Sequence, residues 1–286
     1  MDGVPQEHAS PRRPIHRPRP AMTVSSLAAP PVPADLIALA NRLADTSGAL
    51  IRQYFRTPVA VDDKADDSPV TIADRGAEEA MRAVLAEAVP DHGIIGEEFG
   101  RSNEGAELVW VLDPIDGTKA FISGKPSFGT LIALMRNGRP WLGVIDQPIT
   151  GERWIGAAGH GTTLAGRTLA TRACPDLDKA TLYATAPEMF RGDDWPAFQR
   201  LYQSVKLPRY GCDCYAYGLL ALGFVDLVCE ADLKVYDWAA VVPVIEQAGG
   251  IVTDWQGRPL TPASDGRVLA AGDARLHAAA LARLAG

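Results

Sequence analysis

The sequence contains no apolar run that approaches the ~20 residues of a membrane-spanning helix, so a transmembrane segment is excluded. Cysteine is scarce: four cysteines occur in 286 residues, and none belongs to a Cys-x-x-Cys pair. Cys212 and Cys214 lie close together, but the second ligand pair of a structural zinc site is missing. Reduced thiols in a cytoplasmic protein are therefore expected. The five histidines are scattered, which argues against a histidine-based mechanism.

The first 33 residues differ in composition from the rest of the chain. Arginines alternate with prolines between Pro11 and Pro20, and further prolines follow up to Pro33. Such a segment buries too little apolar surface to fold, so residues 1–33 are predicted to form a disordered arm. It lacks the apolar core, about 7–15 residues long, of a secretory signal. Met22 lies inside it, so a translation start at that codon and a functional arm remain alternatives.

The charge of the chain limits its partners. The formal net charge is −7, although the arm contains four arginines and only two acids, so residues 34–286 are more acidic than the whole. An acidic body repels polyanions, and we expect neither a nucleic-acid nor a membrane partner. A small phosphate-bearing ligand would need a local positive charge, such as a metal ion. With 47% hydrophobic residues, the chain can bury a sizeable core.

Hydrophobic periodicity predicts alternating helices and strands in the body. Helices are predicted at 34–55, 71–89, 195–205, 215–222, 239–248 and 275–284. Strands are predicted at 93–97, 108–112, 130–135, 141–145, 153–157, 181–184, 225–229 and 267–271, with a hairpin turn at Asn137-Gly138. The pattern indicates an α/β sandwich of stacked layers. Two packed halves are expected, at roughly 34–172 and 173–286.

Acidic residues follow two of the predicted strands. Asp113 and Asp116 come after the apolar run 108–112 in the stretch Asp-Pro-Ile-Asp-Gly-Thr, and Glu97 and Glu98 come after the preceding strand. Oxygen ligands at strand ends, followed by backbone N–H groups, suit a divalent metal that holds a phosphate. Taken alone, an Asp-Pro and Asp-Gly stretch is more often an ordinary turn.

Three separate motifs, in the expected order, resemble the inositol monophosphatase family. Gly96-Glu97-Glu98 corresponds to the family's Gly-Glu-Glu, residues 113–118 to its Asp-Pro-Ile-Asp-Gly-Thr, and residues 236–240 to its Trp-Asp-x-Ala-Ala. Tyr236 replaces the usual Trp, and Lys119-Ala120-Phe121 stands where many members have Thr-Asn-Phe. The resemblance covers most of the chain. It implies a metal-dependent phosphatase with the layered αβαβα sandwich of the inositol monophosphatase and fructose-1,6-bisphosphatase type.

The resemblance also implies the metal ligands. Glu97, Asp113 and the carbonyl oxygen of Ile115 would bind one ion. Asp113, Asp116 and Asp237 would bind a second ion, so that Asp113 bridges the two. Clustered carboxylates repel one another unless a cation neutralises them, and oxygen ligands favour Mg²⁺, or Mn²⁺, over zinc. The alternative for each acid is a solvated surface group, and for Asp237 a helix cap.

By the same resemblance, Thr118, Glu97 and Asp74 would hold the attacking water. Asp74 follows Thr71 in the family's Thr-x-x-Asp arrangement, and the alternative is a pair that only caps the helix N-terminus. The backbone N–H groups of Gly117 and Thr118 would bind the phosphate oxygens.

Three further residues are expected on the substrate side. Lys64 matches a family lysine in a charged loop, with an ordinary surface lysine as the alternative. Glu230 occupies the position where sugar-specific relatives bind a substrate hydroxyl, and Asp213 is expected at the same end of the pocket. Two acids there suit a substrate with a positive charge, such as the amine of histidinol phosphate. The alternative for Asp213 is a helix N-cap.

The stretches 116–124 and 210–218 resemble histidinol-phosphate phosphatases of this family more than its inositol branch. The hypothesis is a cytoplasmic Mg²⁺-dependent phosphomonoesterase that hydrolyses L-histidinol phosphate in histidine biosynthesis, with a homodimer expected by analogy. The alternatives are an inositol-1-monophosphatase or broad sugar phosphatase, and then a 3′-phosphoadenosine 5′-phosphate phosphatase. A non-enzymatic metal or nucleotide binder belongs to another class, and the presence of Glu97, Asp113 and Thr118 argues against it.

Overall fold

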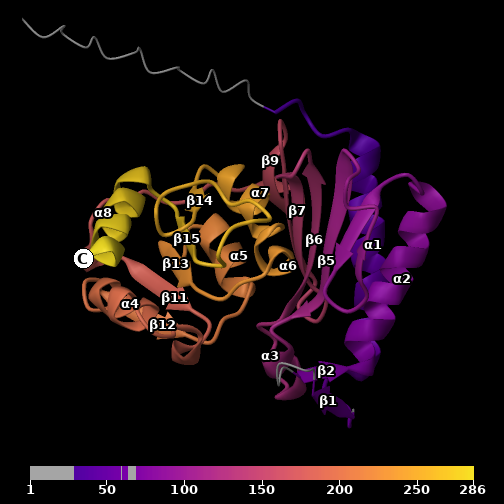
Figure 1. Ribbon diagram of the computed structural model, residues 1–286, viewed down its shortest axis with the longest axis horizontal. Helices are drawn as coiled ribbons and strands as arrows, with labels where there is room; N and C mark the ends of the chain where they lie inside the picture. The colour runs from indigo at the N-terminus through magenta and orange to yellow at the C-terminus, as the bar shows by residue number, and fades with distance from the viewer. Residues whose placement is uncertain (1–28, 59, 64–68) are drawn as a thin grey trace, which may run out of the picture.

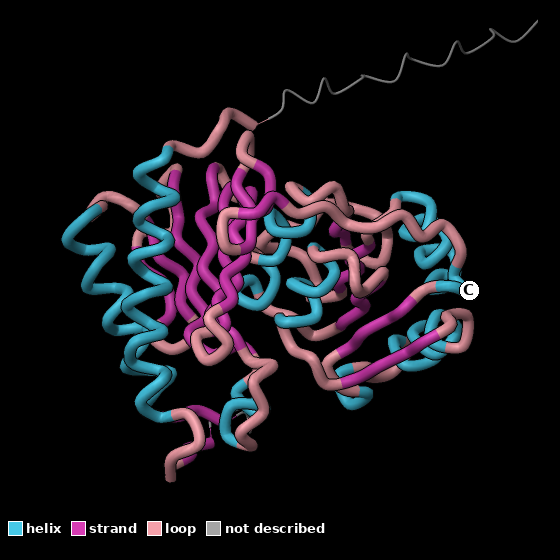
Figure 2. The backbone as a smooth tube through the Cα atoms, turned by 180° about the vertical axis from the view of Figure 1, so that it is seen from behind, coloured by secondary structure: helices cyan, strands magenta, loops and turns pink. Residues whose placement is uncertain are grey.

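The computed structural model describes residues 29–58, 60–63 and 69–286 (Figure 1). Their helices and strands are stacked in the order helix, sheet, helix, sheet, helix, which confirms the predicted layered α/β sandwich (Figures 1 and 2). Within the described ranges, every helix is too short or too polar to cross a membrane. Lys64 and residues 1–28 of the predicted arm lie outside the described residues.

The outer layer on one side consists of α1 (Ala34–Tyr54) and α2 (Ile72–Ala88). On α1 the buried residues Leu36, Leu39 and Leu43 recur every three or four positions, so one stripe of the helix faces the sheet. Thr71 caps α2, because its hydroxyl accepts the N–H of Ala73 at 3.1 Å. Both helices confirm the predicted ones to within one residue at either end.

A large sheet packs beneath these helices. Its strands are β3 (Gly93–Gly96), β4 (Gly100–Ser102), β5 (Leu108–Asp116), β6 (Gly129–Arg136), β7 (Arg139–Gln147), β8 (Glu152–Ala157), β9 (Gly161–Leu164) and β10 (Arg167–Thr168). Their order is β10-β9-β8-β7-β6-β5-β3-β4, antiparallel except for the parallel pair β3 and β5. Asn137 and Gly138 have positive φ values of 50° and 74°, which confirms the predicted hairpin between β6 and β7.

A small sheet lies on the other side of the molecule. Its strands are β11 (Thr181–Ala184), β12 (Leu207–Tyr210), β13 (Leu227–Glu230), β14 (Ile251–Thr253) and β15 (Val268–Ala271), in the order β12-β11-β13-β15-β14. Two helices, α4 (Asp194–Tyr202) and α8 (Ala274–Ala285), cover its outer face. A short hairpin of β1 (Val61–Asp63) and β2 (Pro69–Thr71) and the short helix α3 (Thr118–Ile122) lie beside the lower end of the large sheet (Figure 1).

The central layer is formed by α5 (Tyr215–Ala221), α6 (Val235–Trp238) and α7 (Val241–Glu246). The helix predicted at 239–248 is present but shorter, as α7, and the short helix α6 that precedes it was not predicted. Pro243 accounts for the later start of α7, because proline has no N–H and cannot complete a helical hydrogen bond to residue 239.

Two glycines of the large sheet allow the central helices to approach its backbone. A Cβ atom on Gly143 would overlap the carbonyl oxygen of Ala240, and one on Gly156 would overlap that of Pro243. The hydroxyl of Thr162 donates to the carbonyl oxygen of Val244 at 2.7 Å and adds a polar link. The central helices therefore lie in direct backbone contact with the large sheet.

The end of the predicted arm is packed on the body. Val32 is only 2% exposed, and its N–H donates to the carbonyl oxygen of Ala158 at 2.9 Å. The indole N–H of Trp141 donates to the carbonyl oxygen of Pro30 at 2.7 Å. Nε2 of His160 lies 2.8 Å from the carbonyl oxygen of Val32. The domain boundary predicted at residue 33 thus falls after a segment that contacts the large sheet.

Deletion of residues 29–33 is expected to lower the melting temperature by roughly 2–6 °C, because the burial of Val32 and its hydrogen bonds are lost. Two truncated proteins, one starting at residue 29 and one at residue 34, differ only in this segment. Thermal unfolding followed by fluorescence measures both. Equal melting temperatures for the pair would contradict this prediction.

Candidate active site

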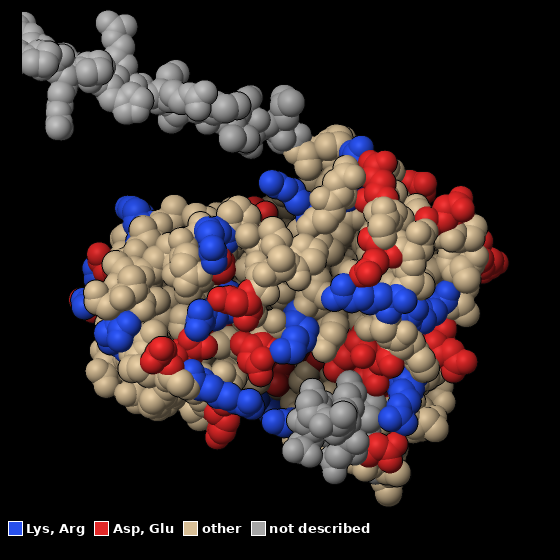
Figure 3. Space-filling model, viewed as in Figure 1, with Lys and Arg blue, Asp and Glu red and all other residues tan. Residues whose placement is uncertain are grey.

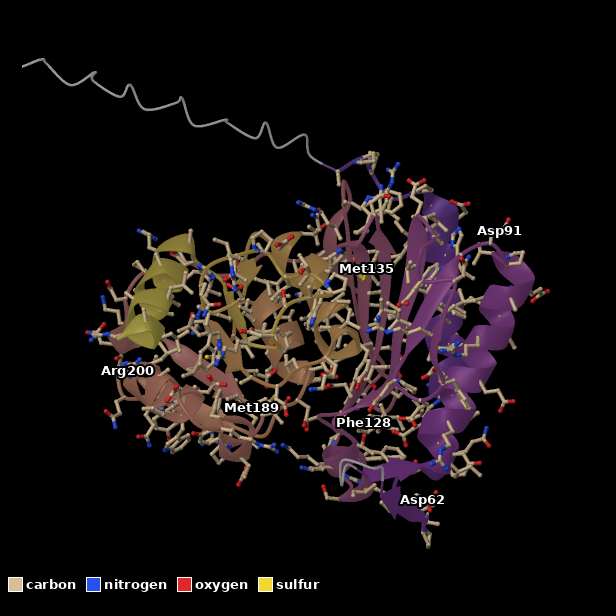
Figure 4. All side chains as sticks on the ribbon, in the orientation of Figure 1. Asp62, Asp91, Phe128, Met135, Met189 and Arg200 are labelled. Atoms are coloured by element: carbon tan, nitrogen blue, oxygen red, sulfur yellow. The ribbon has the colours of Figure 1, made fainter. Side chains whose placement is uncertain are left out.

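A cavity of about 220 Å³ opens between the large sheet and the small-sheet side of the molecule. Most of its wall comes from the ends of strands and the first turns of helices, and the lining residues are Glu97, Asp116, Gly117, Thr118, Lys119, Thr185, Met189, Asp213, Cys214, Tyr217, Glu230, Leu233 and Asp237. On the face shown in Figure 3, acidic side chains gather where these two sides meet. Met189, labelled in Figure 4, belongs to the small-sheet side.

A compact group of carboxylates lies at this cavity. Asp113, Asp116 and Asp237 each offer one oxygen atom, and these atoms all lie within 4.8 Å of one another. Asp113 and Asp116 come from the end of β5, whereas Asp237 comes from α6 in the central layer. The packing of α6 on the large sheet therefore brings together acids that are far apart in the sequence.

A bulge at the end of β5 places the first two acids. Asp113 pairs with Leu131 and Asp116 with Gly129 of β6, so β5 carries one extra residue between the pairs. In a regular strand, residues three apart point to opposite faces, and the extra residue removes that separation. The hydroxyl of Thr130 donates to the Pro114 carbonyl oxygen at 2.7 Å and holds the bulge from the β6 side.

Burial and mutual repulsion perturb these acids. Desolvation raises the pKa of Asp113 well above its usual range, and the nearby charge of Glu97 raises it further. Desolvation also raises the pKa of Asp116, with an added effect from the charge of Asp237. The pKa of Asp237 is raised to about 7, mainly by desolvation. Such a group needs protons or a cation for neutralisation, and its oxygen donors fit a divalent metal ion.

Glu97 and Asp74 approach the group from two elements. The N–H of Glu97 donates to the carbonyl oxygen of Leu112 at 3.1 Å, directly after the pairing of β3 with β5. Asp74 is buried on the first turn of α2, where it accepts the N–H and the hydroxyl of Thr71 at 2.8 and 2.6 Å. The capping pair considered in the sequence analysis is therefore present. Burial raises the pKa of Asp74, and the charge of Glu97 contributes, so the two acids are neighbours.

The turn after β5 leads into α3. Gly117 has a φ of +81°, and a Cβ atom there would lie 2.8 Å from Cβ and Cγ of Asp213. Only glycine fits this position without strain. The hydroxyl of Thr118 donates to the carbonyl oxygen of Ile115 at 3.1 Å. Gly117 and Thr118, which were predicted to bind the phosphate, therefore line the cavity. The hydroxyl of Thr118 contacts the Ile115 carbonyl oxygen, which was predicted to be a metal ligand.

Asp213 is buried in the cavity wall just before α5. Its Oδ2 accepts the hydroxyl of Ser127 at 2.5 Å. The cap residue of α5 is Cys214, which makes no side-chain capping bond, so the structure does not support the N-cap interpretation of Asp213. The N–H of Cys214 donates to Oδ2 of Asp116 at 2.7 Å and ties this turn to the acidic group.

Glu230 is buried at the end of β13. Its Oε1 accepts the N–H and the hydroxyl of Thr185 at 2.9 and 2.6 Å, and its Oε2 accepts the hydroxyl of Tyr217 at 2.8 Å. Burial raises the pKa of Glu230, and these hydrogen bonds oppose the rise. The three donors hold the carboxylate in one orientation beside the cavity.

The sequence analysis did not identify every residue of the cavity wall. Thr185 follows the predicted strand 181–184, and its place at a strand end was a usable signal. Met189 lies in a short 3₁₀ turn and Leu233 in an irregular segment, so no periodicity marks either residue. Tyr217 falls on a predicted helix, where only the packing shows that it contacts Glu230.

The chain is similar to known phosphatases in sequence and in fold. Residues 33–285 match the inositol monophosphatase family. The chloroplastic bifunctional phosphatase IMPL2 of Arabidopsis thaliana is 54% identical over 256 residues, which cover 86% of this chain and 74% of that protein. A histidinol-phosphatase of Chlorobaculum parvum is 38% identical over 224 residues, 77% of this chain and 86% of that protein. The structure of an inositol monophosphatase from Zymomonas mobilis shows 51% identity and a TM-score of 0.82, and the match covers 88% of this chain and 98% of that chain.

The layered fold and the acidic cavity, together with these matches, define a phosphatase. The match to this family covers nearly all of the described residues, from residue 33 to residue 285 in the last helix. The chain belongs to the inositol monophosphatase family, whose members are metal-dependent. The group of Asp113, Asp116 and Asp237 could hold the metal.

Proposed function

We propose that this protein hydrolyses L-histidinol phosphate to L-histidinol and phosphate in histidine biosynthesis, with Mg²⁺ as its cofactor. The observation that carries the proposal is the pair of buried acids, Asp213 and Glu230, in the wall of the cavity. The similarity to a histidinol-phosphatase at 38% identity supports it.

The chemistry of the cavity wall favours a cationic substrate. Two carboxylates beside a further acidic group attract an amine and give a neutral polyol less advantage. The charge of Asp213 also contributes to the raised pKa of Glu230, and both side chains line the same cavity. Met189 and Leu233 add apolar surface on which an imidazole ring could pack.

For the cofactor, we assign Glu97, Asp113 and the Ile115 carbonyl oxygen to one ion, and Asp116 and Asp237, with Asp113, to a second. These residues fit a divalent cation because they offer oxygen ligands, and their carboxylates repel one another without a cation. A bound divalent ion supplies Lewis acidity and neutralises developing negative charge during hydrolysis of the ester.

The residues of the chain then orient the reactants. Gly117 and Thr118 line the cavity, and their backbone N–H groups are assigned to bind the phosphate oxygens. The hydroxyl of Thr118, with Glu97 and Asp74, is assigned to hold the attacking water. Lys64 is assigned to the phosphate by resemblance alone, since it lies outside the described residues.

We infer that water attacks the phosphate directly, because the one thiol among the described residues of the cavity wall is a poor nucleophile. Cys214 lines the cavity, but burial raises the pKa of its thiol well above the usual range, and the charge of Asp116 raises it further. A neutral buried thiol is a poor nucleophile. The geometry therefore favours hydrolysis without a phosphocysteine intermediate.

Hydrolysis of inositol monophosphate is the second candidate. The 51% identity with the Zymomonas mobilis inositol monophosphatase over 98% of that chain favours it. Phosphate release from histidinol phosphate and from inositol-1-phosphate, with Mg²⁺ and with EDTA, separates the two candidates. We expect kcat/KM for histidinol phosphate to be at least about tenfold higher, a difference of about 1.4 kcal/mol. A preference for inositol-1-phosphate would replace our proposal with the second candidate.

Asp213→Asn is expected to raise KM for histidinol phosphate about tenfold or more, because a charge-assisted hydrogen bond is worth roughly 1.5–3 kcal/mol. Asparagine keeps an oxygen that can accept from Ser127, so the wall should retain its shape. Glu230→Gln should act in the same direction. Steady-state kinetics on both esters measures the effect, and inositol-1-phosphate should be largely unaffected.

The matched control is Glu188→Gln, which removes an exposed acid that does not line the cavity. It should leave both substrates unchanged. Equal losses on the charged and the neutral ester in Asp213→Asn would assign Asp213 a structural role and favour the inositol-type function.

The proposal includes a reducing, cytoplasmic environment and a homodimer. All four cysteines are free thiols, which supports the first. The homodimer rests on analogy with the family. Light scattering on the purified protein measures its mass directly, and a monomer at micromolar concentration would contradict that part.

A further inference from the structure

Glu78 is a fully buried acid that the site described above does not include. It lies on α2, one helical turn after Asp74, and its side chain is 0% exposed. Its Oε2 accepts the N–H of Glu98 at 2.7 Å, and its Oε1 accepts the N–H of Phe99 at 3.2 Å. A buried carboxylate on a helix thus binds the turn that directly follows Glu97.

Arg82 completes this arrangement one turn further along α2. Its Nε donates to Oε1 of Glu78 at 2.7 Å, and its Nη2 donates to the carbonyl oxygen of Gly100 at 2.5 Å. One ion pair on α2 therefore binds two N–H groups of the turn at 97–99 and the carbonyl oxygen of Gly100, the first residue of β4. A buried ion pair adds little net stability, so its value here lies in the backbone conformation that it selects.

The same carboxylate also contacts the chain before Glu97. A Cβ atom on Gly96 would overlap the carboxylate of Glu78 and would lie 2.7 Å from Nη2 of Arg82. Gly96 itself pairs with Leu112 of β5, as the last residue of β3. The backbone is thus fixed on both sides of Glu97, by Gly96 against Glu78 and by the N–H of Glu98 on Glu78.

We propose that Glu78 is the positioning residue for Glu97, and that Arg82 orients Glu78 for this role. Glu78 does not line the cavity and acts only through the backbone that carries Glu97. The inference rests on the proposed function in one respect, the assignment of Glu97 to a metal ion. It adds to that function a determinant of metal affinity on α2.

The test measures binding of Mg²⁺ or Mn²⁺ alone by calorimetry, in the unaltered protein, Glu78→Gln, Glu97→Gln and the double variant. Glu78→Gln is expected to lower the affinity for the metal ion about 10-fold or more, which is the range found when a group that orients a metal ligand is removed. In the Glu97→Gln background the same change should alter affinity less than about twofold, because the residue through which Glu78 acts is already lost. Glu79→Gln, an exposed neighbour on α2, is the matched control and should have no effect.

A purely structural role predicts a different pattern. If Glu78→Gln weakens metal binding equally with and without Glu97, or does not weaken it at all, the inference is wrong. If Glu97→Gln itself leaves metal binding unchanged, the metal assignment in the proposed function fails instead, so the two failures can be told apart.

Arg82→Lys provides a second variant that should fold even if Glu78→Gln does not. Lysine keeps the charge beside Glu78 but cannot reproduce the fork that binds Glu78 and Gly100 together. We expect a loss of metal affinity of roughly threefold, again absent in the Glu97→Gln background. An equal loss in both backgrounds would overturn the proposal.

Discussion

Asp113→Asn is expected to reduce phosphate release about a thousandfold or more at saturating Mg²⁺, since several kcal/mol of charge stabilisation are lost. Asparagine has nearly the same shape and keeps the oxygen that accepts the Ile115 N–H, at 3.0 Å in this structure. The loss would therefore come from the charge that is assigned to both ions. Single-turnover kinetics over a range of Mg²⁺ concentrations measures it, and turnover comparable to that of the unaltered protein would contradict the assignment.

The same substitution should have the opposite effect on the stability of the metal-free protein. The raised pKa of Asp113 means that its ionised form is disfavoured in the folded state, so a neutral side chain removes repulsion at neutral pH. We expect the melting temperature in EDTA to rise by roughly 2–6 °C. Asp273→Asn is the control, because the hydrogen bond from Arg275 at 2.7 Å lowers the pKa of Asp273 to about 2, so this variant should become less stable. A lower melting temperature in both variants would contradict this prediction.

Gly143→Ala is expected to lower the free energy of unfolding by about 3 kcal/mol, because its Cβ atom would overlap backbone that no rotamer change can move. The contacted Ala240 follows α6, so the shift should also carry Asp237 away from Asp113 and weaken metal binding. Denaturant unfolding and metal titration measure the two effects. Gly105→Ala is the matched control, because no atom lies within 4 Å of its added Cβ. Equal stability of the two variants would contradict the predicted contact.

The long helices were predictable because their signal is local. On α1 and α2 one buried stripe recurs with the helical period, and that stripe is visible in the sequence. β12 and β14 were missed for the opposite reason. Both are short edge strands of the small sheet, and β12 contains Pro208 and exposed Leu207 and Arg209. Such strands depend on the neighbour that they pair with, which the sequence does not show.

The candidate site divides in a similar way. Asp113, Asp116 and Asp237 were predicted to lie together, and the structure brings their oxygen atoms together. The hydrogen bonds that orient Glu230 and the contact of Glu78 with the turn after Glu97 were not predictable. Each depends on where separate layers meet in space, and motif spacing carries no information about that.

The division of the acidic group between two layers has a consequence for how the protein is made. A ribosome releases Asp113 and Asp116 with the large sheet, and Asp237 only after most of the small sheet has been synthesised. Two carboxylates bind a divalent ion less firmly than three, so binding would strengthen when α6 docks late in synthesis. An ion at this group would therefore stabilise completed molecules more than partly synthesised chains.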